Sequence, residues 1–355
     1  MKLARYLNFE FFINISLVAI GLVLLFAFFD FLQEIGNLNS GKYDLPKIIT
    51  FISLSMPGHL YEIIPLACLI GSMFTIGQLS GNSEIVVMRT SGMSIFKIAS
   101  SLLFVSLVFS FLTFFVGNLI TPISEKNAQQ VKINATDGTV TTDFRSGVWM
   151  KDGNNFVNIE NVLPDASLKD IHIYEFDNSF ALRSIVDAEK GKYRNGVWEL
   201  ENIKQSFIIN EGFDIIEMAS GTWQSMIKPE MMNVLLISPD RMSIFDLNDF
   251  IKYLKKNNQK TSRYEVSFWE KIIQPLMPMI MILFSVPFGF FQERSGGKYL
   301  KMFLGIIFGI SYQILNSLFR HIGVLNDWEP IATAIAPSLL ILSIAIFLMR
   351  KFERQ

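Results

Sequence analysis

Six long apolar runs, nearly free of charged residues, constrain this chain more than any other feature. Each has about twenty residues or more, which at 1.5 Å per residue is enough for a helix to cross a hydrocarbon core of about 30 Å. The runs are Phe11–Leu32, Ile48–Leu79, Ile95–Ile120, Trp269–Phe291, Met302–Ile322 and Ile331–Met349. The sequence therefore predicts an α-helical membrane protein with six transmembrane helices.

The first run begins close to the N-terminus, where a cleaved signal peptide is the alternative. A signal peptide has an apolar core of about 7–15 residues followed by a small-residue cleavage site. Phe11–Leu32 is longer, and Phe28-Phe29-Asp30-Phe31 is a poor cleavage context. We therefore expect a retained transmembrane helix, with Asp30 near its far end, where a charge costs less than at the membrane centre.

Prolines predict where the spans bend or end. Pro57 and Pro65 remove backbone donors from the second span and are expected to kink it. Thr121-Pro122 is expected to close the third span. Three prolines predict a bent fourth span: Pro275, Pro278 and Pro287.

The fifth span carries two features that suit contact with protein. Gly305 and Gly309 form a GxxxG motif, which permits close approach of helices but is common by chance. Tyr312, Gln313 and Asn316 add a polar stripe, which we expect to face protein or a cavity instead of lipid.

Between the third and fourth spans, charged and turn residues return and apolar positions alternate. Asp152-Gly153-Asn154-Asn155 predicts a turn between strands Gly147–Lys151 and Phe156–Glu160. Asn195-Gly196 predicts a tight hairpin between Lys190–Arg194 and Val197–Glu201. The other predicted strands are Ile171–Phe176, Ala181–Asp187, Lys204–Ile209 and Asp214–Gly221. Short strands with regular turns predict an inserted all-β domain of the sandwich or jellyroll type.

These patterns divide the chain into three parts. Residues 1–122 would hold transmembrane helices 1–3, with a short cytoplasmic helix at 82–92. Residues 123–262 would hold the β domain, with a helix near 243–256 that begins at a capping-box pair, Ser243 and Asp246. Residues 263–355 would hold transmembrane helices 4–6.

Basic residues predict which way the chain crosses the membrane. Six spans place both termini on one side, and the positive-inside rule assigns the side richer in Lys and Arg to the cytoplasm. The terminal side carries Lys2, Arg5, Arg89, Lys97, Arg294, Lys298, Lys301, Arg350, Lys351 and Arg354. The short loops opposite carry Lys42, Lys47 and Arg320. Both termini are therefore expected in the cytoplasm and the β domain on the outer side.

A short polar stretch, Ser80–Gly92, lies between the second and third spans on the predicted cytoplasmic side. Asn82 or Ser83 can cap the start of a helix, and Gly92 can end it in a left-handed conformation. The result would be a helix of about two turns at the membrane surface. Helical spacing places four residues on one face: Glu84, Val87, Met88 and Ser91. A tight loop in water is one interpretation, and a helix that docks a soluble partner is the other.

Other classes of function lack their residue patterns. The net charge of −1 gives no reason to expect nucleic acid, and Cys68, the single cysteine, permits no intramolecular disulfide or CxxC site. Gly36 to Tyr43 nearly matches the phosphate-binding loop GxxxxGK[ST], but Tyr43 stands where Ser or Thr is needed and no strand precedes it. His59 with Glu62 fits an interfacial polar pair better than a metal site. The chain contains no HExxH or GxSxG motif, so we expect no cofactor, no metal and no enzymatic activity.

Four local patterns, together with this architecture, resemble the LptF/LptG lipopolysaccharide export permeases over the whole chain. The patterns are Pro65 with Gly71; Ser83-Glu84-x-Val86-Val87-Met88-x-x-Ser91-Gly92; Trp149-x-Lys151-Asp152-Gly153-Asn154-Asn155-Phe156-Val157; and Trp269-x-Lys271-x-x-Gln274-Pro275-Leu276. The third pattern favours the LptG branch over the LptF branch.

The resemblance implies partners and a mechanism. LptF and LptG pair in the bacterial inner membrane, and two copies of the ATPase LptB dock beneath them. The complex extracts lipopolysaccharide from the lipid of the outer leaflet of this membrane and passes it to LptC and then LptA. The periplasmic jellyroll would continue this path, and spans one and five would form the lateral gate beside the partner subunit.

The resemblance also implies site residues. The segment from Ser83 matches the family's coupling helix, and Glu84 matches the acidic residue that sits in a groove of the ATPase. The residues implied in ATPase coupling are Ser83, Glu84, Val87, Met88, Ser91 and Gly92. Lipid A phosphates favour basic residues at the outer rim, where the candidates are Lys42, Lys47, Lys271 and Arg320. Relatives often carry several lysines just beyond the first span, where this chain has Glu34.

Two other classes remain open at this point. One is a different ABC-type lipid or lipoprotein permease, which usually has four spans per chain. The other is a membrane-anchored periplasmic receptor or scaffold with a β sensor domain, which would need neither a docking helix nor several proline-bent spans.

Overall fold

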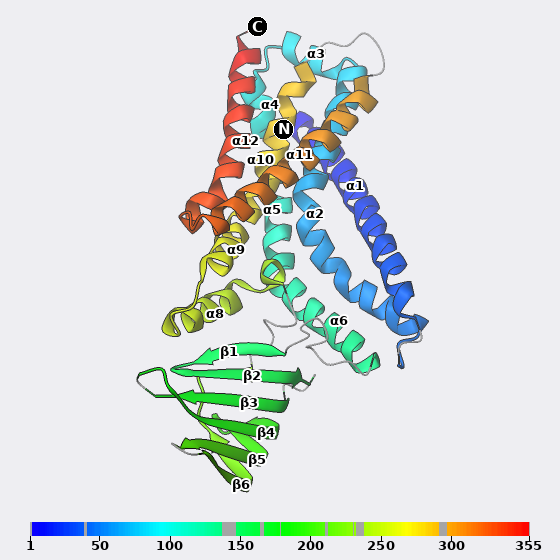
Figure 1. Cartoon of the computed structure of the whole chain (residues 1–355). Helices are drawn as coiled ribbons and strands as arrows, with labels where there is room; N and C mark the ends of the chain where they lie inside the picture. The colour runs from blue at the N-terminus through cyan, green and yellow to red at the C-terminus, as the bar shows by residue number, and fades with distance from the viewer. Residues whose placement is uncertain are drawn as a thin grey trace. The chain divides into compact units, whose positions relative to one another are not determined.

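The computed structural model of the protein describes residues 2–38, 41–136, 147–163, 167–177, 179–209, 212–229, 231, 238–290 and 297–354. These residues form two compact units, shown with all elements in Figure 1. The first unit comprises Met1–Leu32, Ser55–Ser124 and Ser262–Gln355, and the second comprises Gln33–Leu54 and Glu125–Thr261. The chain crosses from one unit to the other within three helices: α1 (Lys2–Glu34), α2 (Leu45–Gly81) and α6 (Thr121–Ala135).

Six helical spans in the described residues are long and apolar enough to cross a membrane, which confirms the prediction. Helices α1 and α2 are the first two. The third contains α5 (Leu103–Phe115), which follows α4 (Ile95–Ser101) and leads into α6. The fourth contains α9 (Ser262–Ile273) and α10 (Met277–Ser285). The fifth and sixth are α11 (Gly297–Leu325) and α12 (Pro330–Glu353).

The third span does not end at Thr121-Pro122 as predicted. A π-helical turn, Val116–Ile120, leads from α5 directly into α6, which continues to Ala135. Pro122 follows this turn directly, so the N–H that proline lacks is missing where the hydrogen-bond pattern is already irregular. The expectation was wrong because a π-helical turn lets the helix continue past a proline.

The fourth span is bent at its prolines, as predicted. A 3₁₀ turn, Gln274–Leu276, separates α9 from α10, and a second 3₁₀ turn, Val286–Phe290, follows α10. Each turn contains a proline, which cannot donate the backbone hydrogen bond that a continuous α-helix requires.

Several glycines of the first unit permit close packing, and three of them lie between the helices α1, α2 and α11. A Cβ atom on Gly71 of α2 would lie 2.6 Å from the Cα atom of Ile15 in α1. A Cβ on Gly305 would lie 3.1 Å from the Cβ of Met73, and a Cβ on Gly309 would lie 2.0 Å from Cδ1 of Leu66. The GxxxG motif of α11 therefore packs on α2, as its spacing allows.

The second unit contains one antiparallel sheet of six strands in the order β1 to β6. The strands are β1 (Val148–Asp152), β2 (Asn155–Val162), β3 (Leu168–Phe176), β4 (Leu182–Arg194), β5 (Val197–Ile209) and β6 (Gly212–Trp223). The all-β character of the insert is confirmed. The short predicted strands on either side of residues 188–189 and 202–203 are joined into the long strands β4 and β5, and the described strands form a single sheet.

Both predicted hairpins are present. Asp152 pairs with Asn155 at the β1–β2 turn, and Arg194 pairs with Val197 around Asn195-Gly196. Asn195 and Gly196 have φ values of 51° and 89°, the left-handed conformation that a tight hairpin turn needs. Alternation puts Val157, Ile159 and Ile171 on a fully buried face of the sheet.

Helix α8 (Ile244–Lys256) follows the sheet and matches the helix predicted near 243–256. Ser243 accepts a hydrogen bond from the backbone N–H of Asp246, and its hydroxyl donates to the Asp246 side chain at 2.6 Å. At the other end, Tyr253 donates to the carbonyl of Lys151 at 2.7 Å, and Asn257 accepts from the N–H of Gly153. These two bonds hold the helix against the β1–β2 hairpin.

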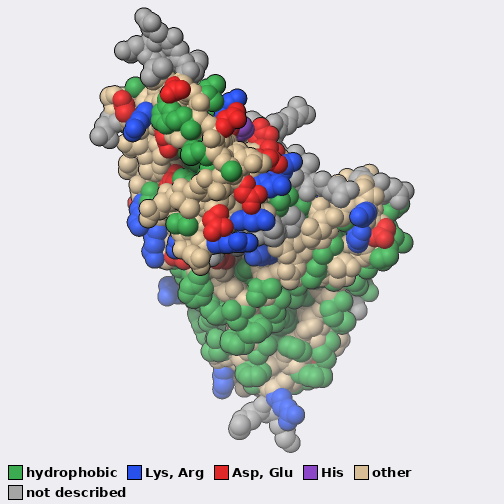
Figure 2. Space-filling model, turned by 90° about the horizontal axis from the view of Figure 1, so that it is seen from below, with side chains coloured by type: hydrophobic (Ala, Val, Ile, Leu, Met, Phe, Trp, Pro, Cys, Tyr) green, Lys and Arg blue, Asp and Glu red, His purple; other side chains and the backbone are tan. Residues whose placement is uncertain are grey.

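The surface combines apolar and charged areas. Figure 2 shows hydrophobic side chains spread over a broad area of one face, with Lys, Arg, Asp and Glu side chains gathered in another area. The exposed apolar residues of α11 include Phe303, Ile307, Ile310, Ile314 and Leu318. Such a face on a helix of this length suits contact with lipid or with another membrane helix.

Candidate functional site

The predicted helix between the second and third spans is present as α3 (Glu84–Thr90). Its start differs from the expectation, since Ser83 adopts the left-handed conformation with φ of 61° and its side chain makes no capping bond. Gly92 ends the segment with φ of 83°, as predicted. Its N–H donates to the carbonyl of Arg89 at 2.8 Å, which satisfies one of the last carbonyls of the helix.

The two faces of α3 are sharply different. Ile85 and Met88 are buried inside the chain, with 8% and 6% of their surface exposed. Val86 and Val87 point outward and are 53% and 61% exposed. Met88 therefore does not join Val87 in an exposed apolar patch as expected, and Val86 takes that place. The spacing argument failed because it could not tell which side of so short a helix faces the core.

Glu84 is the acidic residue of the first turn of α3 and is partly exposed. Its Oε1 atom accepts a hydrogen bond from Nδ2 of Asn82 at 3.1 Å. Among the residues that the structure describes, no basic side chain forms an ion pair with it. Tyr6 of α1 also forms a side-chain hydrogen bond with this carboxylate. A carboxylate that accepts only neutral donors keeps its negative charge available for a cation.

A contact that the sequence did not indicate supports α3 from the far end of the chain. The Oε2 atom of Glu353, at the end of α12, accepts a hydrogen bond from the N–H of Ile95 at 2.7 Å. Nη1 of Arg89 lies 4.0 Å from the same oxygen, and the Arg89 guanidinium lies 5.4 Å from the ring centre of Phe290. Glu353 thus connects the last helix to α4 and to the end of α3.

Two of the predicted rim lysines, Lys42 and Lys47, lie together in the second unit. Lys42 is exposed, in the segment before α2, and Lys47 is partly exposed in the first turn of α2. The ammonium of Lys47 donates to the carbonyl of Lys42, and the N–H of Lys47 donates to the carbonyl of Asp44 at 3.0 Å. The two side chains therefore belong to one compact turn.

The other two candidates, Lys271 and Arg320, belong to the first unit and are both engaged. Lys271 is 2% exposed, and its ammonium lies 4.9 Å from the ring centre of Tyr61. Nε of Arg320 donates to Oε1 of Glu270 at 3.2 Å, and Asn316 donates to the same oxygen at 3.3 Å. Substrate binding by these two residues stays a prediction, and it would require the buried Lys271 side chain to move.

The polar stripe of the fifth span is partly confirmed. Tyr312 is 9% exposed, and Asn316 bonds to Glu270, so both face protein. Gln313 is exposed on the surface of this chain. Helical spacing places Gln313 about a quarter-turn from Tyr312, which moves it beyond the buried side of the helix.

The isolated polar groups of the second span also have defined partners. Nε2 of His59 lies 2.6 Å from Oδ2 of Asp30 in α1, and the ring of Phe26 stacks on the imidazole at 5.4 Å. Asp30 was not expected as a partner of His59, and the pairing of His59 with Glu62 stays a prediction. The described residues contain no group of three or more His, Cys, Asp or Glu side chains placed to hold a metal ion. The near match to a phosphate-binding loop includes residues 39 and 40, which lie outside the described residues.

Comparison with known proteins gives a consistent result. A family model described as "Lipopolysaccharide export system permease LptF/LptG" matches residues 5–351. A protein of Escherichia coli strain K12, described as lipopolysaccharide export system permease protein LptG, is 31% identical over 352 residues, or 98% of each chain. A protein of Haemophilus influenzae with the same description is 29% identical over 332 residues, or 93% of each chain.

Proposed function

The chain belongs to the LptF/LptG family of lipopolysaccharide export permeases, and on that premise we propose how it works within the system. It is a permease subunit of the lipopolysaccharide transporter and a multi-pass protein of the inner membrane. In the proposal it pairs with a second permease of the LptF type. Two copies of the ATPase LptB bind on the cytoplasmic side and supply the energy, because this chain lacks a complete nucleotide-binding loop.

The observation that carries the proposal is the exposed side of α3. Val87 projects outward one turn from Glu84, and Val86 is exposed further around the helix. Ile85 and Met88 are buried and fix the helix to the first unit. An apolar patch next to a carboxylate without a cation fits a groove that is apolar and contains Arg or Lys. We propose that the ATPase supplies this groove and that α3 transmits its motion to the spans.

The proposed lateral gate uses spans one and five. Within the membrane-spanning part of each helix, 22% of the first span and 11% of the fifth span is buried inside this chain, against 78% for the second. The least covered helices have the most surface available for a second subunit or for lipid. This supports α1 and α11 as the helices that face the partner permease.

In the proposed orientation both termini and α3 are cytoplasmic and the β domain is periplasmic. The domain would receive lipopolysaccharide from the membrane helices and deliver it to LptC and LptA. Lys42 and Lys47, on the outer side, would meet the phosphates of lipid A, since ammonium groups form charge-assisted hydrogen bonds with phosphate. Lys271 and Arg320 would contribute only after leaving their present partners.

Purification in mild detergent with mass analysis of all components tests the proposal. We expect an ATPase subunit, a second permease with six spans and lipid A to purify with the tagged chain. As a matched control, the same chain with Glu84→Lys should lose the ATPase and retain the second permease. Recovery of the chain alone, or with an unrelated membrane partner, would contradict the proposed assembly.

The rim lysines give a separate prediction. The triple variant Lys42→Glu, Lys47→Glu and Lys271→Glu should reduce photocrosslinking to lipopolysaccharide, because each change places a negative charge where a phosphate is proposed to bind. The control replaces three exposed lysines that α8 and β4 carry: Lys252, Lys255 and Lys190. Unchanged crosslinking in the triple variant would remove these lysines from the substrate site.

A further inference from the structure

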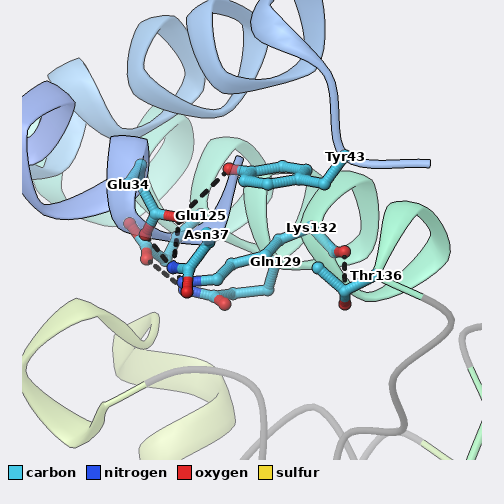
Figure 3. Close-up of polar contacts among 7 residues, drawn as sticks. All are labelled: Glu34, Asn37, Tyr43, Glu125, Gln129, Lys132 and Thr136. Carbon is cyan, nitrogen blue, oxygen red and sulfur yellow. Dashed lines mark hydrogen bonds and ion pairs between the residues drawn. The ribbon is translucent and has the colours of Figure 1, made fainter. Parts of the chain in front are cut away.

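A buried polar cluster in the second unit joins the end of α1, the segment before α2 and the helix α6. At its centre is Glu34, which is 4% exposed. Nζ of Lys132 lies 2.7 Å from Oε1 of Glu34, and the hydroxyl of Tyr43 donates to Oε2 at 3.2 Å. Asn37 also donates to Oε2 at 3.2 Å. Figure 3 shows the side chains of Glu34, Lys132 and Tyr43 converging from three segments of the chain.

Tyr43 is the member that reaches from the loop into the cluster. Its side chain is fully buried, although the neighbouring Lys42 is exposed. Burial, followed by the charge of Glu34, raises the pKa of the Tyr43 phenol, so the hydroxyl stays protonated and remains a donor. The backbone N–H of Lys42 donates to the carbonyl of Ala135, the last residue of α6, at 2.6 Å. Lys42 and Tyr43 thus attach the segment before α2 to the end of α6 and to Glu34.

A second carboxylate holds α6 itself in place. Glu125 is 5% exposed and accepts hydrogen bonds from Arg241 at 2.9 Å and from Gln129 at 3.1 Å. Each buried carboxylate therefore has its own cation, which is the condition for keeping charges away from water. Because Lys132 is paired with Glu34, its charge is compensated inside the protein.

We infer that Glu34, Tyr43 and Lys132 are positioning residues, which fix the segment Gly41–Lys47 to α6 and so present Lys42 and Lys47 to the phosphate groups of the substrate. Glu34 does not itself touch the substrate. It neutralises Lys132 and holds Tyr43. Tyr43 in turn fixes the backbone from which the side chains of Lys42 and Lys47 extend. The anchoring stands on the observed contacts, and only its purpose rests on the proposed function.

The anchoring can be measured without any substrate. Trypsin cleaves after lysine, and the Lys42–Tyr43 bond is protected while Tyr43 is buried. In the assembled complex in nanodiscs, Glu34→Gln and Lys132→Met should each speed the release of the peptide ending at Lys42 by about tenfold, because cleavage follows the population of the open segment. The exchange Glu34→Lys with Lys132→Glu should slow cleavage only in part, because it restores the ion pair while a lysine at position 34 cannot accept the hydrogen bond from Tyr43. Unchanged cleavage in both single variants would overturn the inference.

Two controls separate local release from general unfolding. Arg194, in the exposed β4–β5 hairpin, provides a second cleavage site in the same molecules, and its rate should be the same in all variants. Glu189→Gln changes an exposed carboxylate of β4 and should leave cleavage after Lys42 unchanged.

ATP-driven lipopolysaccharide release from proteoliposomes tests whether this anchoring positions Lys42 and Lys47 for the substrate. Glu34→Gln and Lys132→Met should raise the half-saturating lipopolysaccharide concentration about tenfold with little change in the maximal rate, and the exchange should reverse this rise in part. A structural role alone would lower only the amount of active complex. Faster trypsin cleavage with an unchanged half-saturating concentration would overturn the positioning role. If the double variant Lys42→Gln with Lys47→Gln also leaves release unchanged, the proposed binding of phosphate by these two lysines is contradicted.

Discussion

At the scale of single residues, two carboxylates of the described chain have opposite surroundings. Glu34 is buried and paired with Lys132, so its charge is already used inside the protein. Glu84 is partly exposed, and its side-chain partners, Asn82 and Tyr6, are both neutral. A carboxylate that stays in water has no desolvation penalty. It stabilises an assembly only when a partner protein buries it together with a cation. This difference separates a residue that organises the chain from one that is available to another chain.

Glu84→Lys should therefore abolish recovery of the ATPase while the permease still inserts and folds. Loss of one member of a buried charge pair costs about 2–5 kcal/mol, which exceeds the ~0.3–1 kcal/mol that a first-turn carboxylate gains from the helix dipole. The measurement is ATPase copurification and lipid release from proteoliposomes. Asp249→Lys, at an exposed position of α8, is the matched charge reversal and should have no effect. Normal recovery and release with Glu84→Lys would exclude α3 as the coupling helix.

At the scale of elements, α3 and the glycine contacts show how the first unit combines a packed core with an exposed face that is proposed to bind the ATPase. Ile85 and Met88 join the apolar core, which also includes Leu79, Ile98 and Leu102. Gly71 lets α2 approach the backbone of α1. An exposed residue of α3 can therefore be changed without disturbing packing, and a buried residue cannot.

Val87→Asp and Met88→Ala should have separate effects. Val87→Asp should weaken ATPase recovery and leave the melting temperature of the detergent-solubilised chain unchanged, because the side chain is 61% exposed. Met88→Ala should lower the melting temperature, since removing a buried side chain of this size costs about 2–5 kcal/mol. If Val87→Asp lowered the melting temperature as much as Met88→Ala does, the assignment of the two faces would be wrong.

Gly71→Ala should destabilise the α1–α2 contact. The new Cβ would lie 2.6 Å from a backbone atom of Ile15, so a helix must shift, and overpacking of this kind typically costs about 1–3 kcal/mol. Gly21→Ala in α1 is the control, because no atom lies within 4 Å of its added Cβ. The thermal stability of the two variants in the same detergent is the measurement. Equal stability would show that α1 and α2 do not pack in this way in the membrane.

At the scale of the whole molecule, the chain consists of a helical unit and a unit that contains the sheet, joined by continuous helices. Leu32 and Gln33 are neighbours in α1, yet they belong to different units, and the same holds for Leu54 and Ser55 in α2. The end of the first span and the start of the second therefore share a compact unit with the β strands. A domain attached through helices receives displacements more directly than one on a flexible linker.

Cysteine labelling tests the orientation of this arrangement. Single cysteines at Asn154 or Asn195, both exposed in hairpin turns, should react with an impermeant thiol reagent in intact spheroplasts. A cysteine at Ser295, outside the described residues, should react only after lysis. The native Cys68 is fully buried and should give little background. Labelling in the opposite sense would reverse the proposed direction of export.

The sequence predicted what depends on local pattern and missed what depends on distant partners. Apolar length identified the spans, and Asn195-Gly196 identified a hairpin, because each signal lies within a short window. The pair Glu34–Lys132 joins residues 98 positions apart, and the contact of Glu353 with Ile95 joins residues 258 apart. Packing decides such contacts, so no window could have revealed them. The same reason explains why helical spacing alone did not identify Met88 as buried.

The strand order of the sheet bears on how the chain is made. Each strand from β2 to β6 pairs with the strand that immediately precedes it in the sequence. In the proposed orientation, every hairpin can therefore close as soon as its second strand has crossed the membrane. Pairings between sequence neighbours have a small loop-closure cost and form early. In the proposed orientation, the sheet can therefore begin to assemble during translocation, hairpin by hairpin, while the later spans are still being made.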